Sequence, residues 1–228
     1  MTLTHARAPK QFSYTLSGVT LSVVSNHPYL GVSISNKLNW NSHIQNICAK
    51  ANRSLGFIKR NLYSCNQSTK LTAYRSLVRP QVEYSSSVWD PHTKTNIDQL
   101  ERVQKRAARF ILNDYKSKSP GCATQMVKDL ELEPLSTRRK ARRLCVFQQA
   151  RLGDLSLPIG NLLQPVQRQS RHHHPESYST ISANKDCYKN SFIPKTIRDW
   201  NSLPPHLISI TKPEPFKTAV TKYLSNQD

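Results

Sequence analysis

Basic side chains recur at helical spacing in two segments of this sequence. In the first segment, residues 95–112, four of them stand at i, i+3, i+4 and i+7: Arg102, Lys105, Arg106 and Arg109. In the second segment, residues 136–153, two pairs lie one turn apart: Arg138 and Arg139, then Arg142 and Arg143. Residues at this spacing share one face of a helix, and a row of cations there fits the phosphates of a nucleic-acid backbone.

The alternative is that these cations only solvate the helix surfaces. Few acidic residues stand near them in the sequence, although Glu101 can pair with Lys105 at i+4. The chain carries 33 Lys and Arg against 14 Asp and Glu, a formal net charge of +19. A surface of this sign attracts nucleic acid or an acidic membrane face. The pattern favours phosphate contact, and we expect RNA or DNA, bound with little sequence preference, as the partner.

Aromatic residues are interleaved with these cations, and they can either stack on bases or pack in a core. They are Tyr63, Tyr74, Tyr84, Trp89, Phe110 and Tyr115. Base stacking is typical of grooves that bind single strands. Because Tyr74 and Phe110 lie on or beside apolar helix faces, core packing is the better interpretation for these two.

No set of residues has the spacing of a catalytic or metal-binding site. The sequence has no Asp-Asp pair and its first acidic residue is Glu83, whereas two-metal nucleotidyl transfer needs carboxylates that converge on two cations. Neither a nucleophilic serine motif, a zinc-peptidase motif nor a P-loop occurs. The triplet His172–His174 has no cysteine or carboxylate at ligand spacing, so we expect no metal there. We predict no catalytic residue and no cofactor.

Cysteine usage and hydropathy bear on the compartment. The five cysteines are odd in number, widely spread and without a C-x-x-C pair, which favours reduced thiols in an intracellular protein, nuclear or cytoplasmic. The first residues contain no apolar segment of a secretory signal. No apolar run approaches the ~20 residues that cross a bilayer, so we expect no membrane partner.

The hydropathy pattern predicts a mainly α-helical chain that begins with a short β-hairpin. Apolar and polar residues alternate over 19–24 and again over 30–34, and the turn-like sequence SNHP joins the two runs. Two strands alone are marginal in water, so this pair needs a partner surface. We expect the following residues to lack a full set of partners: Val19, Leu21, Val23 and Trp40.

Helical periodicity follows in five segments, at residues 42–62, 68–80, 95–112, 123–132 and 136–153. Thr95 and Asp98 form a capping box at the start of the third, and Gly153 can end the fifth. Short helices return near the C-terminus. The predicted division is an N-terminal segment (1–18), a hairpin (19–40), a helical domain (41–153), a flexible linker (154–188) and a C-terminal helical segment (189–228).

Four blocks of sequence, in this order, resemble one protein family. They are YLGV…LNW..HI (29–44), KANRSLGFIKRNL (50–62), AYRSLVRPQVEYSSSVWDP (73–91) and LERVQKRAARFI (100–111). Together they resemble the C-terminal part of the reverse transcriptases of non-LTR retrotransposons, the LINE-type or jockey-like elements. The later sequence NSFIPKTIRDWNSLPPHL resembles the extreme C-terminal end of these enzymes, and the resemblance covers most of residues 19–224.

The resemblance implies a role for each segment. Tyr29, Leu30 and Gly31 would belong to the primer-grip hairpin that positions the primer end, and the helices after it would form the thumb that grips the template–product duplex. The catalytic aspartates of the family have no counterpart here, and the fingers and most of the palm are missing. The resemblance therefore implies a truncated RNA-directed DNA polymerase that is inert in synthesis but retains non-specific nucleic-acid binding.

Two alternatives to this interpretation stay open. The chain can be an accessory part of an active reverse transcriptase, with palm and fingers supplied by upstream sequence or by another polypeptide. It can also be an interaction module, or a relic of a transposable element without a selected role. An upstream open frame with adjacent Asp codons would favour the first alternative.

Overall fold

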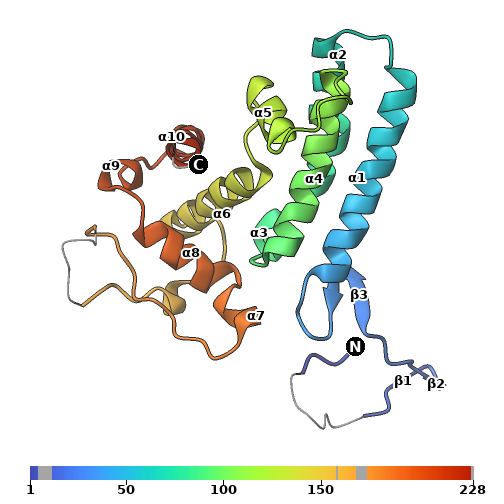
Figure 1. The fold of residues 1–228 in the computed structure, drawn as a ribbon. Coiled ribbons are helices and arrows are strands. Elements are labelled where there is room, and N and C mark those ends of the chain that lie inside the picture. Colours follow the sequence, from blue (N-terminus) through green and yellow to red (C-terminus); the bar gives the residue numbers. More distant parts are fainter. Residues whose placement is uncertain (5–11, 158, 168–173, 227–228) are drawn as a thin grey trace.

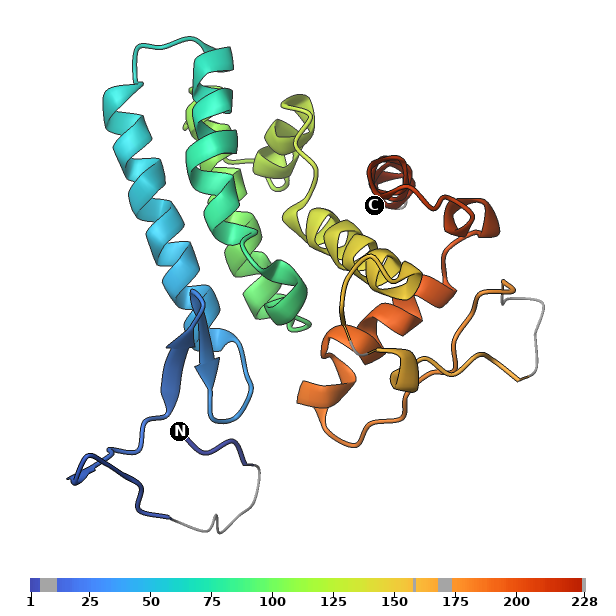
Figure 2. The same cartoon turned by 180° about the vertical axis from the view of Figure 1, so that it is seen from behind.

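The computed structural model describes residues 1–4, 12–157, 159–167 and 174–226, and it is mainly α-helical, as the sequence predicts (Figures 1 and 2). Two small antiparallel hairpins come first: β1 (Thr15–Leu16) with β2 (Val19–Thr20), and β3 (Asn26–Tyr29) with β4 (Val32–Ser35). The helical elements follow in the order α1 (Asn41–Asn61), α2 (Gln67–Ala73), the π-helical turn η1 (Tyr74–Val78), the 3-10 turn η2 (Arg79–Val82), α3 (Ser86–Trp89), α4 (Lys94–Ile111), α5 (Cys122–Asp129), α6 (Leu135–Leu152), the 3-10 turn η3 (Gly160–Leu162), α7 (Asp186–Lys189), α8 (Phe192–Asn201), α9 (Pro205–Ile208) and α10 (Pro213–Ser225).

The β3–β4 hairpin turns at a different place from the predicted one. Asn26 and Pro28 of the expected turn lie within β3, and the chain reverses at Leu30 and Gly31. Both turn residues have positive φ, 45° and 81° respectively. Positive φ at both positions matches the right-handed twist of two strands joined by a two-residue turn. The prediction was therefore wrong about the turn, although a hairpin forms.

Apolar side chains near the N-terminus are exposed, as predicted for three of the four named residues. Val19 is 68% exposed, Leu21 51% and Val23 80%. The prediction was wrong for Trp40, which is half-buried because it packs against the core beside α1. β3 is exposed along its length and pairs only with β4 among the described strands, so one edge of this small sheet is open.

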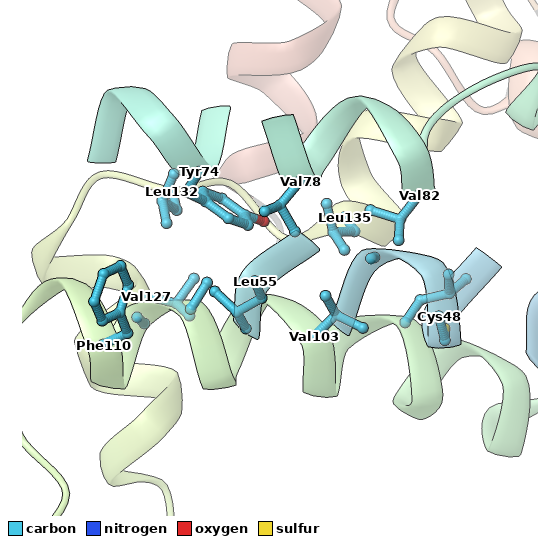
Figure 3. Packing of buried hydrophobic residues seen from close by; sticks show 14 of the residues in the cluster. Cys48, Leu55, Tyr74, Val78, Val82, Val103, Phe110, Val127, Leu132 and Leu135 are labelled. Atoms are coloured by element: carbon cyan, nitrogen blue, oxygen red, sulfur yellow. The ribbon is translucent and has the colours of Figure 1, made fainter. Parts of the chain in front are cut away.

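The first core lies between α1, the α2–α3 segment and α4. In Figure 1, α1 and α4 run in the same direction and the segment between them runs back. Figure 3 shows the apolar side chains of these elements gathered between the ribbons, Leu55 and Val103 among them. Tyr74 and Phe110 lie in this core, as predicted, at 0% and 2% exposure. The Tyr74 hydroxyl donates a hydrogen bond to Gln104 Oε1 over 2.8 Å, which satisfies its buried polar end.

The predictions of the helix ends are confirmed only in part. Gly153 follows α6 with φ of 85°, a left-handed conformation that glycine adopts without strain, so its predicted place at the helix end is confirmed. The predicted capping box does not form, because α4 begins at Lys94 and Thr95 lies inside the helix. The second predicted helical segment, 68–80, was expected to end at Pro80. The chain instead continues through Pro80 as the 3-10 turn η2.

A second core lies between α6 and the helices that follow it. Leu144 and Phe147 of α6 pack here with Trp200 and Phe216, and all four are 0% exposed. Leu135, at the start of the same helix, belongs to the first core. Helix α6 is therefore shared by the two cores, and the predicted boundary at residue 153 does not separate two independent packing units.

The described part of residues 154–188 packs against the second core, although the sequence predicted a flexible linker. Pro165 forms an isolated antiparallel bridge with Tyr178, and the Tyr178 ring meets the edge of Phe147. His174 is buried, with Nε2 3.1 Å from the carbonyl oxygen of Trp200. His172 and His173 lie outside the described residues. Isolated apolar contacts of this kind leave no periodic pattern in a sequence.

A buried group of charges joins the two cores. Asp90, just after α3, accepts from Arg139 Nε over 3.0 Å and from Lys195 Nζ over 2.7 Å, and it also pairs with Arg143. Arg143 further pairs with Asp199 of α8. Arg139 and Arg143 are each 1% exposed, so these are interior charges that depend on each other.

Replacing Asp90 by Asn should lower the free energy of unfolding by about 3–5 kcal/mol at pH 7, because buried cations lose their counter-charge. Burial alone would raise the pKa of Asp90, but the charges of Arg143, Lys195 and Arg139 more than offset it and hold this pKa below its ordinary value. The stabilisation is therefore fully present above about pH 4. It is lost as the pH falls through the lower pKa of the folded state.

Urea unfolding of the wild type and the Asp90→Asn variant at a series of pH values measures this difference. The exposed Asp98 makes no ion pair in the described part of the chain, so Asp98→Asn is the matched control and should stay within about 0.5 kcal/mol of the wild type. Equal stabilities of Asp90→Asn and the wild type at pH 7 would show that the buried charges are not interdependent.

Candidate nucleic-acid interface

The predicted row of cations on α4 is only partly available to a ligand. Arg102 and Arg106 are exposed and Lys105 is half-buried. Arg109 turns into the loop after α4, where its guanidinium donates to the carbonyl oxygen of Ser117 over 2.8 Å and contacts Cys122 Sγ at 3.1 Å. Arg109 thus closes this loop, which corrects its expected role in phosphate contact.

Three of the four arginines predicted on α6 are also occupied within the protein. Arg138 pairs with Glu83 and with Glu133. Arg139 and Arg143 are the buried partners of Asp90 described above. Only Arg142 is exposed, and its Nη1 donates to the carbonyl oxygen of Glu83 over 3.3 Å. Both sides of α6 are covered by a core, so its cations form ion pairs in place of the expected nucleic-acid surface.

Glu101 differs from its predicted pairing with Lys105. Its carboxylate accepts from the backbone N–H groups of Leu135 and Ser136, over 3.2 and 2.8 Å. Pro134 precedes α6 and offers no side-chain cap, so Glu101 satisfies the first N–H groups from another helix. Lys105 makes no ion pair in the described part of the chain, which leaves its charge for solvent or a ligand.

Helix α1 presents cations that our sequence analysis did not single out. Lys50, Arg53 and Arg60 are exposed, Lys59 is half-buried, and the helix contains no acidic residue. The signal was present in the sequence, because every charged residue before Glu83 is basic. With the α4 cations they form what we name the α1–α4 basic face: Lys50, Arg53, Lys59, Arg60, Arg102, Lys105 and Arg106.

Like charges approach each other where α1 meets α4. Arg106 Nη1 donates to Asn52 Oδ1 over 3.2 Å, which draws the guanidinium across to α1. Burial, and then the charge of Arg106, lower the pKa of Lys59. The Lys59 ammonium also lies 5.5 Å from the centre of the Tyr115 ring. Neither cation pairs with a carboxylate among the described residues, so an anion bound here would relieve their repulsion.

A groove opens beside the tip of the β3–β4 hairpin, and we name it the hairpin groove. Its volume is about 570 Å³, and it is lined by Pro28, Leu30, Gly31, Ser33, His43, Asn46, Ile47, Lys50, Arg53, Gln81 and Tyr84. Two of the predicted primer-grip residues line it, Leu30 and Gly31, while Tyr29 is 62% exposed at the same tip. Lys50 and Arg53 belong to both the groove and the basic face, so the two surfaces are continuous.

Contacts from two helical segments fix the hairpin above this groove. The Tyr84 hydroxyl donates to the carbonyl oxygen of Leu30 over 3.2 Å. A Cβ atom at Gly31 would stand 3.1 Å from Tyr84 Cε1, so a side chain would crowd the ring as well as strain the turn. The N–H of Ser33 donates to His43 Nδ1 over 3.2 Å, and burial lowers the pKa of His43, which favours the neutral acceptor.

Comparison of the chain with models of known protein families, with curated proteins and with solved structures found no match. The described helices include none with the length and apolar character to cross a membrane. The family resemblance of the four sequence blocks therefore stays a prediction. The support for a function comes from the geometry of the basic face and the hairpin groove.

Arg109→Gln and Arg102→Gln should separate a structural cation from a surface cation. The Arg109 change should lower the free energy of unfolding by about 1–3 kcal/mol, because it removes charge-assisted hydrogen bonds to the loop carbonyls. The Arg102 change should stay within about 0.5 kcal/mol of the wild type, because that side chain is exposed. Urea unfolding measures both, and equal losses would contradict the assignment of Arg109 to the loop.

Proposed function

We propose that this chain is the thumb-like part of a reverse transcriptase of the non-LTR retrotransposon type, and that it binds RNA or DNA backbones with little sequence preference. The α1–α4 basic face is the observation that carries the proposal. Its seven cations lie on two adjacent helices, and none of them pairs with a carboxylate in the described part of the chain. Phosphate groups at regular spacing are the ligand that such a surface attracts.

The hairpin groove supports the same function because it combines cations with an exposed aromatic ring. Tyr84 is 56% exposed and offers a face on which a base can stack. Lys50 and Arg53 line the groove and also belong to the basic face, so a strand bound in the groove meets cations of both surfaces. The four blocks that resemble the family include all seven cations of the basic face and most residues of the groove, although Pro28, Asn46 and Ile47 lie outside them.

The open edge of the hairpin supports a palm as a further partner. The outer edge of β3 is unpaired among the described strands, and three exposed apolar residues, Val19, Leu21 and Val23, precede this strand in the sequence. A further sheet at this edge would complete its hydrogen bonds, and the exposed apolar side chains offer additional surface for packing. Within the proposal, such a sheet comes from the palm, either on the same polypeptide or on another one.

The acidic residues of this chain favour binding without synthesis. Asp90, Asp199 and Glu83 each pair with at least one arginine. Carboxylates held by arginine are not free to converge on two catalytic cations. The proposed contribution of these residues is therefore the grip on nucleic acid, while nucleotide transfer belongs to a palm.

Binding should depend on salt through the basic face. Arg53→Gln, Arg60→Gln and Arg106→Gln combined remove three exposed cations from it. If each contacts a phosphate, the slope of log affinity against log salt should flatten by about 2 units on single strands, at about 0.7 per contact. Fluorescence anisotropy of a labelled oligonucleotide between low and moderate salt gives the slope.

A matched control removes the same charge elsewhere. Lys128, Lys185 and Lys212 are exposed and lie outside both surfaces, so their combined change to Gln keeps the net charge equal to that of the test variant. The control should retain the wild-type slope. Identical slopes for the test variant and the wild type would sink the proposal that the basic face is the interface.

Purified protein should extend no primer with any template in the presence of Mg²⁺ or Mn²⁺. The reason is that the described part of the chain brings no three His, Cys, Asp or Glu side chains together to hold a metal ion, and not weak binding of the substrate. A primer-extension assay checks this, with anisotropy run in parallel to show that primer–template is bound. Incorporation that survives removal of contaminating polymerase would overturn the assignment of catalysis to a palm.

A further inference from the structure

A second polar cavity lies on different elements from the basic face and the hairpin groove. It has a volume of about 200 Å³ and is formed by α6, α10 and the chain from Glu83 to Ser86. Its lining residues are Glu83, Ser86, Glu133, Arg138, Arg139, Ala141, Arg142, Lys217 and Thr221. Arg138 and Arg142 stand one turn apart on α6, as do Lys217 and Thr221 on α10, so each helix turns one face toward it.

The charges of this cavity do not cancel. Glu83 and Glu133 both form ion pairs with Arg138. Within the described part of the chain, Arg142 donates to a carbonyl oxygen and pairs with no carboxylate. Lys217 has one acidic partner, Glu214, at 3.5 Å, and that pair is exposed and therefore weak. Glu83 and Glu133 share one arginine, so one negative charge is left over, and Arg142 with Lys217 leaves the lining with an excess of one positive charge before Arg139 is counted.

The floor of the cavity contains buried polar groups without a partner. Arg139 and Ser86 are each 1% exposed and both line the cavity. Among the described residues, nothing bonds to Arg139 Nη1, Arg139 Nη2 or Ser86 Oγ. Buried donors are nearly always satisfied in folded proteins, so an acceptor is expected near them.

The ion-paired charges to which Arg139 belongs, some buried and some partly exposed, are also positive in sum. Two carboxylates, Asp90 and Asp199, face four cations: Arg139, Lys140, Arg143 and Lys195. A positive excess in a region of low dielectric raises the attraction for an anion in the adjoining cavity.

We propose that this cavity binds a phosphate-class oxyanion. Arg142 and Lys217 supply its counter-charge, the hydroxyl groups of Ser86 and Thr221 supply hydrogen bonds, and Arg139 adds positive potential from below. The phosphate can belong to a nucleic-acid backbone, or it can be free phosphate or a phosphate monoester. The proposal does not depend on the α1–α4 basic face, because the two sets of residues do not overlap.

Isothermal titration calorimetry of the full chain with inorganic phosphate, at ionic strength matched with chloride, tests the proposal. The wild type should show saturable binding. Arg142→Gln combined with Lys217→Gln should weaken it at least about tenfold through the loss of two charge-assisted hydrogen bonds. Thr221→Glu, which puts a carboxylate at the half-buried edge of the cavity, should abolish it.

The control is Lys128→Gln combined with Lys185→Gln, which removes the same charge from exposed positions outside the cavity and the basic face and should leave phosphate binding unchanged. The proposal is overturned if the wild type shows no saturable phosphate binding, or if both cavity variants bind phosphate as the wild type does. Loss of phosphate binding in the cavity variants with oligonucleotide binding retained separates this site from the proposed function.

A final titration distinguishes the two sources of the phosphate. Oligonucleotide is added to saturation before inorganic phosphate is titrated. If the bound oligonucleotide blocks phosphate binding, the cavity holds a backbone phosphate. If phosphate binds with unchanged affinity, the cavity serves free phosphate or a monoester.

Discussion

The carboxylate of Asp90 is the point on which the arrangement of the two cores depends. Asp90 follows α3 and accepts hydrogen bonds from cationic side chains of α6 and α8. One side chain therefore joins residues that lie 49 to 105 positions further along the chain. Burying either guanidinium group alone would cost desolvation free energy, and so would burying the Asp90 carboxylate without them. These charges can be buried because each has a partner of opposite charge. This pairing allows α6 to lie between the two cores with charged side chains in the interior.

This arrangement decides which cations remain for a ligand. Helix α6 contributes Leu135 to the first core and Leu144 and Phe147 to the second, and Arg139 and Arg143 occupy further interior positions. Helices α1 and α4 pack on one side only, and their outer faces stay in solvent. The positive charge of the chain is thereby divided into an interior part that stabilises the fold and an exterior part on α1 and α4 that can meet phosphate.

Sequence periodicity identified the long helices, because each carries an apolar face at the helical spacing. It could not tell Arg139 and Arg143 from surface arginines, because their carboxylate partners lie 49 to 56 residues away and form no local pattern. The turn at Leu30 and Gly31 was missed for a similar reason. SNHP looks more like a turn, and only the pairing of β3 with β4 shows where the chain reverses. The hairpin groove needs Tyr84 from a distant segment, so no local pattern predicts it.

The short segment from Glu83 to Ser86 is what the hairpin groove and the oxyanion cavity have in common. Glu83 faces α6 and pairs with Arg138, while the next residue, Tyr84, reaches the hairpin tip in another direction. Ser85 then takes a left-handed conformation, with φ of 50°, which is strained for a residue with a side chain. The indole N–H of Trp89 donates to the carbonyl oxygen of Tyr84 over 2.8 Å and closes this turn. The residue that pairs with α6 at the cavity and the residue that holds the hairpin are therefore adjacent in the chain, within one turn that Trp89 closes.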